Sequence, residues 1–383
     1  MVPEVIKMSK NNKYLRNLQA LEEEKNLRSL PASNMAGLVN LSSNDYLGLN
    51  DDNDLQNDFR KSEIFDRLSF SAASTRLLTG NINQYSAVES TLTQLYDREA
   101  SLVFNSGYHA NMGILPAIAD KKDLIIADKE VHASLIDAMK LSASETRRYR
   151  HMDLDHLETI LTTHRDQYEN VFIATESIFS MDGLRTDLPR LLEIKRKYDA
   201  YIYLDEAHAF GVCGEKGLGL AEEMGFVQEI DFIIGTFGKS LAGIGAFIIC
   251  DDLFKKYLVN KSRSLIYTTG LPPVNLAWTH FLLGKLQGMS GKRNHLKETW
   301  NYFAQNLGLK AESHIVPYVL GNNHDVIGFA KYMQHNGFYV LPIRYPTIPK
   351  GTERIRFSFN TTLSKEMIEP IFEVFYKYKK HVE

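Results

Sequence analysis

Short apolar runs alternate with amphipathic stretches between about residue 84 and residue 250, and this alternation restricts the possible folds more than any other feature of the chain. The apolar runs are rich in β-branched residues, as expected of strands: "ASLVFNS", "DLIIAD", "NVFIATES", "AYIYLD", "DFIIGTF" and "GAFIIC". Stretches between them, such as "HASLIDAMKLS" and "LDHLETILTTH", have helical spacing. Nearly all-apolar strands separated by helices predict an α/β fold with a mainly parallel sheet covered on both faces.

The character of the sequence changes after about residue 275. A long helical stretch leads into alternating strand-like and helix-like segments, and a final amphipathic helix, "SKEMIEPIFEVFYKYKKHV", closes the chain. This pattern predicts a second, smaller α+β domain. We therefore expect an N-terminal helix and lead-in segment over residues 1–45, a large domain over 46–275 and a small C-terminal domain over 276–383.

The composition is that of an ordinary globular protein, with 44% hydrophobic and 24% charged residues among 383. A net charge of -3 gives no electrostatic reason to expect nucleic acid or an anionic membrane as a partner. The charged N-terminus lacks the apolar core of a signal peptide, and no apolar stretch approaches the roughly 20 residues that span a bilayer. These features favour a cytoplasmic location. Cys213 and Cys250 show no paired spacing and are expected to be plain buried thiols.

The sequence "DEAH" at residues 205–208, followed by "GKS" at residues 238–240, suggests a nucleotide motor. A phosphate-binding P-loop requires Gly-x-x-x-x-Gly-Lys-Ser/Thr after the first strand. Here the position of the first glycine holds Ile233, and the nearest upstream glycine, Gly235, would make the loop too short to wrap a phosphate. The order is also inverted, because the lysine follows the acidic box by 34 residues. We therefore reject the ATPase interpretation.

What remains is a carboxylate, Asp205, at the carboxyl end of one predicted strand and an amine, Lys239, just past the end of a later one. In open α/β sheets, ligands bind in the crevice outside these strand ends. The pair suits pyridoxal phosphate, because a lysine can hold its aldehyde as a Schiff base while a carboxylate keeps its ring nitrogen protonated. Taken singly, Asp205 could instead cap a helix, and Lys239 could be a solvated loop charge.

Eight motifs occur in the order found in the α-oxoamine synthases, so the chain resembles this family from about residue 27 to residue 360. They are "LSSNDYLGL", "STRLLTGN", "FNSGYHAN", "VHASLIDA", "ESIFSMDG", "LDEAHAFG", "GTFGKS" and "YTTGLPP". The resemblance implies a fold-type I pyridoxal-phosphate transferase that condenses an amino acid with an acyl-CoA, with the cofactor bound by the large domain. The segment "SFSAASTRLLTGN" and the short N-terminal stretch before "NLSSNDYLGL" favour one member of the family. That member joins L-alanine to pimeloyl-CoA, or to the pimeloyl carrier-protein thioester, in biotin synthesis.

Two other functions are compatible with the same residues. A sister enzyme that uses glycine or serine would share every cofactor-binding residue. A non-catalytic regulator that binds the cofactor is less favoured, because such proteins usually carry an added DNA-binding segment or lack the lysine.

The resemblance assigns catalytic roles to four residues. Lys239 would form the Schiff base, Asp205 would pair with the ring nitrogen, His132 would stack on the ring, and His208 would hydrogen-bond its phenolic oxygen. Without the motifs, His132 would be interpreted as a helix cap or surface residue and His208 as a core histidine. Neither histidine has a second ligand at metal spacing, so no metal site is expected.

The resemblance also implies which residues bind the cofactor phosphate and that the protein is a dimer. Gly107 and Tyr108 would offer backbone amides at a helix start, where a phosphate is favoured. Thr236 and Ser180, or a neighbour of Ser180, would add hydrogen bonds to the same phosphate. The family builds its site at a dimer interface, so Thr268 would reach the phosphate of the partner in a homodimer.

The small-molecule substrates would contact residues from both ends of the chain. Arg356 matches the arginine that binds the amino-acid carboxylate, for which a planar guanidinium is well suited. Arg354 is expected on the opposite strand face, with a structural role. Thr347 and Arg28 match positions that contact substrate, the latter near the acyl chain, and Asn44 would also line the site.

The chain departs from the family pattern at two places expected near the mouth of the site. Residues 71–74 read "SAAS" where relatives commonly have a glycine-rich run, and Tyr85 stands where many have a histidine. These departures bear on the preference for the acyl chain.

Overall fold

The structure is a computed structural model that describes residues 4–30 and 37–382. Within this described part, the chain forms two compact units. The large unit comprises Asn44–Glu298 and Asn360–Thr362, and the small unit comprises the rest of the described chain. The division expected from the sequence, with boundaries at residues 45 and 275, stays a prediction. Residues 1–3 and 31–36 of its N-terminal segment, and residue 383 of its C-terminal domain, lie outside the described residues.

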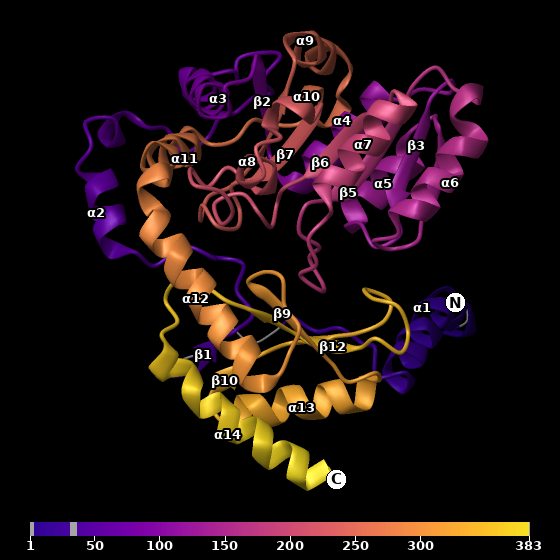
Figure 1. Ribbon diagram of the computed structural model, residues 1–383, viewed down its shortest axis with the longest axis vertical. Helices are drawn as coiled ribbons and strands as arrows, with labels where there is room; N and C mark the ends of the chain where they lie inside the picture. Colours follow the sequence, from indigo (N-terminus) through magenta and orange to yellow (C-terminus); the bar gives the residue numbers. More distant parts are fainter. Residues whose placement is uncertain (1–3, 31–36, 383) are drawn as a thin grey trace. The chain divides into compact units, whose positions relative to one another are not determined.

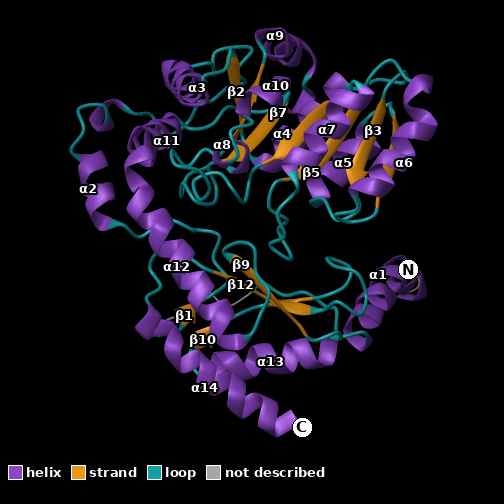
Figure 2. Ribbon diagram, viewed as in Figure 1, coloured by secondary structure: helices purple, strands orange, loops and turns teal. Residues whose placement is uncertain are grey.

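Within the described residues, the large unit holds a seven-stranded sheet in the order β2–β8–β7–β6–β5–β3–β4 (Figures 1 and 2). β8 is antiparallel to its neighbours β2 and β7, and the other pairs are parallel, which confirms the predicted mainly parallel sheet. The strands are β2 (Ala100–Phe104), β3 (Leu124–Asp128), β4 (Glu145–Tyr149), β5 (Val171–Glu176), β6 (Tyr201–Asp205), β7 (Phe232–Thr236) and β8 (Ala246–Cys250).

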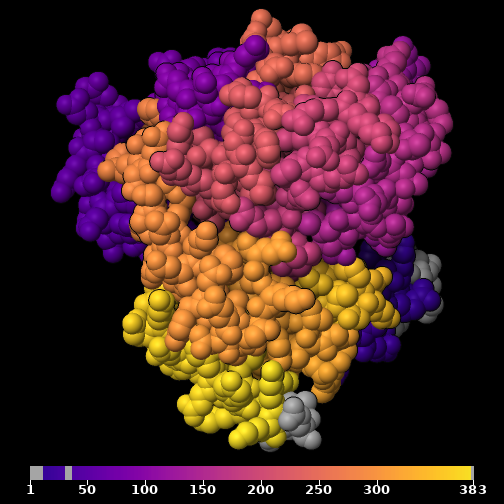
Figure 3. Space-filling view, viewed as in Figure 1, coloured from indigo at the N-terminus to yellow at the C-terminus, as the bar shows by residue number. Residues whose placement is uncertain are grey.

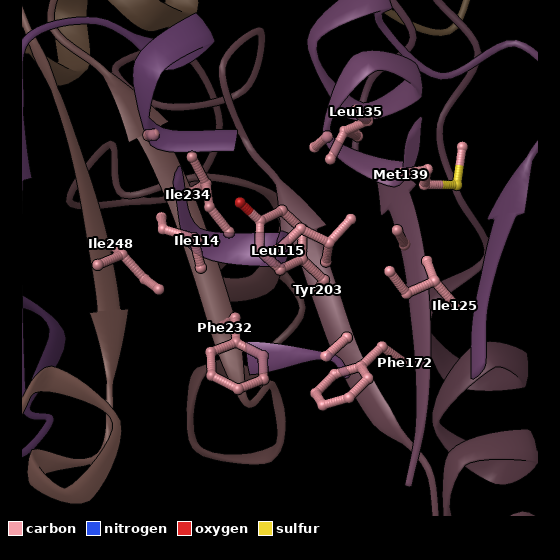
Figure 4. Packing of buried hydrophobic residues seen from close by; sticks show 14 of the residues in the cluster. Ile114, Leu115, Ile125, Leu135, Met139, Phe172, Tyr203, Phe232, Ile234 and Ile248 are labelled. Atoms are coloured by element: carbon pink, nitrogen blue, oxygen red, sulfur yellow. The ribbon is translucent and has the colours of Figure 1, made fainter. Parts of the chain in front are cut away.

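Both faces of this sheet are buried. Ile202, Tyr203 and Leu204 follow one another in β6 and are all buried, although successive strand residues point to opposite faces. On the face of Tyr203, Leu115 and Leu135 from two covering helices join one hydrophobic core (Figure 4). Each such side chain stabilises the fold by about 1.5–3 kcal/mol when fully buried. The side chains of residues from about 100 to 250 pack into one continuous surface (Figure 3).

Several helices of the large unit begin where a side chain accepts a hydrogen bond from a backbone N–H group of the first turn. Ser106 Oγ accepts from His109 N at 3.2 Å, and this contact starts α4. The helices are α2 (Asn53–Arg60), α3 (Asn83–Tyr96), α4 (Gly107–Ile118), α5 (Ala133–Leu141), α6 (Leu154–His164), α7 (Leu188–Tyr198), α8 (Leu220–Glu223), α9 (Asp252–Lys261), α10 (Arg263–Ile266), α11 (Pro273–Lys285) and α12 (Ser290–Leu307), whose residues from Thr299 onward belong to the small unit.

β4 is the strand of the seven-stranded sheet that the sequence did not predict. Its sequence, "ETRRY", is polar, and its first four side chains are exposed or half-buried. β4 pairs with β3 alone, at the edge of the sheet. A strand at the edge of a sheet is less covered than a central strand, so its side chains can be polar. Charged side chains on such a strand also discourage pairing with other chains.

The small unit is an α+β arrangement. β12 (Arg354–Ser358) pairs antiparallel with β9 (Ile315–Val319) and β11 (Pro342–Ile343), and β1 (Val39–Asn40) pairs parallel with β10 (Phe338–Tyr339). Its helices besides part of α12 are α1 (Glu4–Glu23), α13 (Asn323–His335) and α14 (Lys365–Val382). Aromatic rings fill its core, and the Phe303 and Phe357 ring centroids lie 5.0 Å apart. Over residues 4–30 and 37–382, no helix combines the length and the apolar character needed to cross a bilayer.

Candidate active site

Parallel strands β5, β6 and β7 bring chemically active residues to one edge of the sheet. β5 ends at Glu176, β6 ends at Asp205, and these two residues are partners in the strand register. Lys239 lies three residues beyond the end of β7. Its Nζ is 2.8 Å from Nε2 of His208, so the structure brings the predicted lysine and histidine together.

His208 is held from its other side by a residue that the sequence analysis missed. Nδ1 of His208 lies 2.6 Å from the hydroxyl oxygen of Tyr46, which is fully buried. The same hydroxyl lies 3.0 Å from Oδ1 of Asn44, a predicted site residue. A continuous row of hydrogen bonds therefore links Asn44, Tyr46, His208 and Lys239.

Asp205 is 6% exposed and has a fixed orientation. Its Oδ1 accepts from the backbone N–H of Ala207 at 2.9 Å, which is a local turn contact. Its Oδ2 accepts from Nδ2 of Asn111 at 2.8 Å. Asn111 is itself fixed, because Tyr203 donates to its Oδ1 at 2.8 Å and its Nδ2 also reaches Ser134 Oγ at 2.9 Å. Asn111 is a second residue missed from the sequence.

Glu176 is the third missed residue, and its two carboxylate oxygens hold two predicted site residues. Oε1 accepts from the backbone N–H of His132 at 2.6 Å, and Oε2 accepts from that of Ser180 at 3.2 Å. Burial, with the charge of Asp205 adding to it, raises the pKa of Glu176 to about 8. We call Lys239, His208, Asp205, Asn111 and Glu176 the strand-end cluster.

His132 is the N-cap of α5. Its Nδ1 accepts from the backbone N–H of Ser134 at 3.2 Å, so the capping role considered for it is present in the structure. Its ring lies edge-to-face with that of Tyr108, with centroids 6.5 Å apart. Tyr108 in turn hydrogen-bonds Asp137. Stacking of His132 on a cofactor ring stays a prediction.

The residues predicted to hold phosphate surround the start of α4. A Cβ built on Gly107 would lie 3.9 Å from the Cβ of Thr236, an ordinary van der Waals distance, so the start of α4 and Thr236 lie close together. Thr236 Oγ1 donates to the carbonyl of Gly245 at 3.0 Å. Thr268 accepts from Asn105, two residues before the helix, at 3.3 Å. The first N–H groups of a helix lack partners within it, so this position favours an anion.

The acidic box holds a structural residue beside Asp205. Glu206 accepts from the backbone N–H groups of Leu220 at 3.0 Å and Ala221 at 2.8 Å and from Ser177 Oγ at 2.6 Å. Burial raises the pKa of Glu206 to about 7. Gly235, considered above as part of a P-loop, lies within β7 instead, where a Cβ would meet the ring of Phe247 at 2.3 Å.

A loop that carries Ser180 is anchored by His151. Nδ1 of His151 lies 2.8 Å from Asp128 Oδ1, and Nε2 lies 2.9 Å from Asp182 Oδ2. Burial alone would lower the pKa of His151, but the hydrogen bonds and charges of the two carboxylates outweigh it and raise the pKa to about 10. Glu130 adds a third potential metal ligand near His151 and Asp182. A protonated imidazole has no lone pair for a metal. The expectation of no bound metal stays a prediction.

In the small unit, Arg28 and Thr347 lie together although 319 positions separate them, with Arg28 Nη2 2.8 Å from Thr347 Oγ1. They line a pocket of about 390 Å³ that also includes Arg344, which the sequence analysis missed. Burial lowers the pKa of Arg344, and the charge of Arg28 contributes. Two guanidinium groups in one pocket favour an anionic ligand. We call Arg28, Arg344 and Thr347 the arginine pocket.

The expectation that Arg354 and Arg356 point to opposite faces of their strand is wrong. Both belong to β12, and residues two apart in a strand share a face. Their surroundings differ instead: Arg354 is buried and its Nε donates to the carbonyl of Thr352 at 2.8 Å, whereas Arg356 is half-buried.

Tyr85 was expected near the mouth of the site, and this placement stays a prediction. Its side chain is fully buried, and its hydroxyl accepts from the backbone N–H of Leu271 at 2.6 Å. The Arg76 guanidinium stacks over its ring at 4.0 Å. Tyr85 therefore fixes the segment around Leu271.

Comparisons with known proteins show the family of the chain. The family described as aminotransferase class I and II matches residues 36–375. The 8-amino-7-oxononanoate synthase of Haemophilus ducreyi is 48% identical over 341 residues, which cover 86% of this chain and 88% of that protein.

Solved structures give the same result. A serine palmitoyltransferase from S. paucimobilis with bound PLP and myriocin has a TM-score of 0.89 and 25% identity, covering 98% of each chain. The 8-amino-7-oxononanoate synthase of Francisella tularensis has a TM-score of 0.76 and 28% identity, covering 90% of this chain and 98% of that one. The chain belongs to the aminotransferase class I and II family and, within it, to the α-oxoamine synthases.

Proposed function

We propose that this protein is an 8-amino-7-oxononanoate synthase that uses pyridoxal 5'-phosphate. It condenses L-alanine with pimeloyl-CoA, or with the pimeloyl carrier-protein thioester, and releases CO₂ and the thiol in biotin synthesis. The name and 48% identity of the Haemophilus ducreyi relative support this substrate pair. The observation that carries the chemistry is the Lys239 amine, which is held 2.8 Å from His208 Nε2 at the sheet edge where Asp205 ends β6.

The residues present fit this cofactor. The start of α4, with Thr236 close to Gly107, suits a phosphate, which the N–H groups of Gly107 and Tyr108, the Thr236 hydroxyl and Ser180 would hold. Lys239 supplies the only type of side-chain amine that can hold an aldehyde, and Asp205 supplies a carboxylate for a ring nitrogen. When bound, pyridoxal phosphate supplies an aldehyde carbon and a protonated ring that accepts electrons.

Lys239 and His208 are the groups of this chain that would take up and pass on protons during the reaction. Lys239 Nζ would take the Cα proton of alanine, for which it must be a neutral amine. His208 Nε2, at 2.8 Å, can accept a proton from that amine. Asp205 stays aligned because Asn111 and Ala207 donate to its two oxygens. His132, the N-cap of α5, would offer a flat ring face beside the site.

We assign substrate recognition to Arg356, the arginine pocket and Asn44. Arg356 would bind the alanine carboxylate through its planar guanidinium. The arginine pocket would bind an anionic group of the acyl donor, since Arg28 and Arg344 both line it. Asn44 would line the site next to Tyr46, which it contacts at 3.0 Å.

The active form would be a homodimer in which Thr268 reaches the phosphate of the partner. This assignment follows from the family resemblance in the motif "YTTGLPP", which contains Thr268. Sedimentation of the loaded enzyme should show a dimer at assay concentration. A fully active monomer would contradict this assignment.

The function is tested by CoA release with pairs of amino acid and acyl-CoA. L-alanine with pimeloyl-CoA should give the fastest release and a product with the mass of 8-amino-7-oxononanoate. The likeness to serine palmitoyltransferase favours one alternative, a sister enzyme that uses serine, and glycine C-acetyltransferase is another. Turnover only with serine or glycine would establish a sister enzyme, and no release with any pair would refute the proposal.

A further inference from the structure

Tyr46 lies behind His208, on the side away from Lys239. Its hydroxyl lies within hydrogen-bond distance of both His208 Nδ1, at 2.6 Å, and Asn44 Oδ1, at 3.0 Å. The residue is fully buried, so water does not compete freely for these contacts. The direction of each hydrogen bond therefore decides which nitrogen of His208 carries the proton.

The donors and acceptors allow one assignment when Lys239 is protonated. A lysine ammonium only donates, so Lys239 Nζ requires an acceptor lone pair on His208 Nε2 at 2.8 Å. Neutral His208 then carries its proton on Nδ1, which donates to the oxygen of Tyr46. Tyr46 has a single hydroxyl proton and gives it to Asn44 Oδ1. The hydrogen bond at Lys239 and the hydrogen bond at Asn44 therefore require the same tautomer of His208, with the proton on Nδ1.

We propose that Tyr46 is a positioning residue that holds His208 in the Nδ1–H tautomer and so leaves Nε2 free to take a proton from Lys239. This inference rests on the proposed function, since a lysine must be neutral to form an imine with an aldehyde. In the transfer, an N–H bond breaks at Nζ and one forms at Nε2. Lys239 becomes neutral and His208 becomes an imidazolium, whose Nδ1–H still donates to Tyr46.

Tyr46 therefore supports both protonation states of His208 without moving. The bond at one ring nitrogen sets which state the other nitrogen adopts. Other ionisable groups also act on this site, namely Asp205, Glu176 and His132, which interact electrostatically with one another or with Lys239. Replacing Tyr46 with phenylalanine leaves these groups in place, so a change in pH behaviour reports the lost hydroxyl.

The first test uses the apoenzyme. ¹⁵N NMR of histidine-labelled protein, with His208 assigned by comparison with His208→Gln, should show an Nδ1–H signal in the wild type. Tyr46→Phe should give a mixture of tautomers. Asn44→Ala should act in the opposite sense, because Tyr46 then has a proton to donate to Nδ1 and favours the Nε2–H tautomer. Asn44→Ala keeps the test decisive if Tyr46→Phe does not fold.

The second test follows loading of Lys239 with pyridoxal phosphate by absorbance, with borohydride trapping to confirm the position. Tyr46→Phe should load about tenfold more slowly at pH 7, with the pH midpoint of loading about one unit higher, the effect expected from one hydrogen bond to a charged group. The matched control is Tyr96→Phe, because Tyr96 is also buried and donates to the carbonyl of Leu218 at 2.6 Å. The control should load like the wild type.

The outcomes separate this inference from the proposed function. Wild-type ¹⁵N signals and a wild-type loading profile in Tyr46→Phe would overturn the inference and leave the function intact. If the wild type itself forms no adduct at Lys239, the proposed function fails, and the tautomer measurement on the apoenzyme still decides the role of Tyr46.

Discussion

The strand-end cluster of the large unit and the arginine pocket of the small unit differ in how exposed their polar side chains are and in how firmly these side chains are held. In the cluster, Asp205 and His208 are 6% and 5% exposed, and fixed partners hold their polar atoms. In the arginine pocket, Arg28 and Thr347 are exposed and contact each other at the pocket wall. Proton transfer needs fixed geometry, whereas long exposed side chains can adjust to a flexible anionic ligand.

Loss of Lys239 should have the largest effect. Lys239→Ala removes the amine that we propose forms the imine and moves the Cα proton, so turnover should fall by about 10⁴-fold or more. Borohydride should fix no cofactor to the variant. Lys256→Ala removes an exposed lysine paired with Asp252 and should behave like the wild type. Appreciable turnover by Lys239→Ala would remove the central assignment of the cluster.

Asp205→Asn should have the second-largest effect on turnover. The neutral amide keeps the shape but cannot hold a ring nitrogen charged, so kcat should fall by about 10²–10³-fold while cofactor is retained. Steady-state kinetics and bound-cofactor absorbance measure both quantities. Asp199→Asn, at a fully exposed carboxylate, serves as the control. Near-normal kcat in Asp205→Asn would contradict its assigned role.

His151 makes the stability of the cluster's neighbouring loop depend on pH. Its pKa is raised to about 10, so its stabilising effect is complete below the ordinary histidine value of about 6.5 and is lost as pH rises toward 10. Between pH 7 and pH 10, the wild type should lose up to about 3 kcal/mol of unfolding free energy from this group. Denaturant unfolding of His151→Gln should lack that part of the pH dependence. Identical slopes in the two proteins would show that His151 is not charged.

Asn111→Ala tests whether the partners of the cluster matter as much as its members. Asp205 Oδ2 would lose its donor, and turnover should fall by about tenfold, far less than for Asp205→Asn. Measuring kcat in both single variants and in the double variant completes the test. If Asn111→Ala has no further effect once Asp205 is asparagine, Asn111 acts through that carboxylate. Additive effects would show an independent role.

The arginine pocket should give the smallest change and a different kind of change. Arg28→Gln should raise KM for the acyl donor by up to about tenfold with kcat nearly unchanged, because the lost interaction is made equally in the ground and transition states. Arg16→Gln changes another exposed arginine of the small unit and is the matched control. A fall in kcat with constant KM would place Arg28 among the catalytic residues and would erase the contrast between the two regions.

The sequence predicted the large-unit sheet because buried parallel strands are apolar throughout, and it placed Asp205 and Lys239 by the ends of those strands. It missed β4 because an edge strand can be polar. It also missed Tyr46 and Asn111, although both stand in quoted motifs, because their roles depend on partners 162 and 94 positions away. Family membership and cofactor class followed from the ordered motifs, and the family comparison confirmed the membership.

The double attachment made by Glu176 limits how this enzyme can diverge. One carboxylate holds both the cap of α5 at His132 and the loop at Ser180. A substitution there would release the start of α5 and the loop together, because one side chain holds a backbone N–H group of each. The helix start and the loop are therefore coupled, and a change at Glu176 should alter both at once.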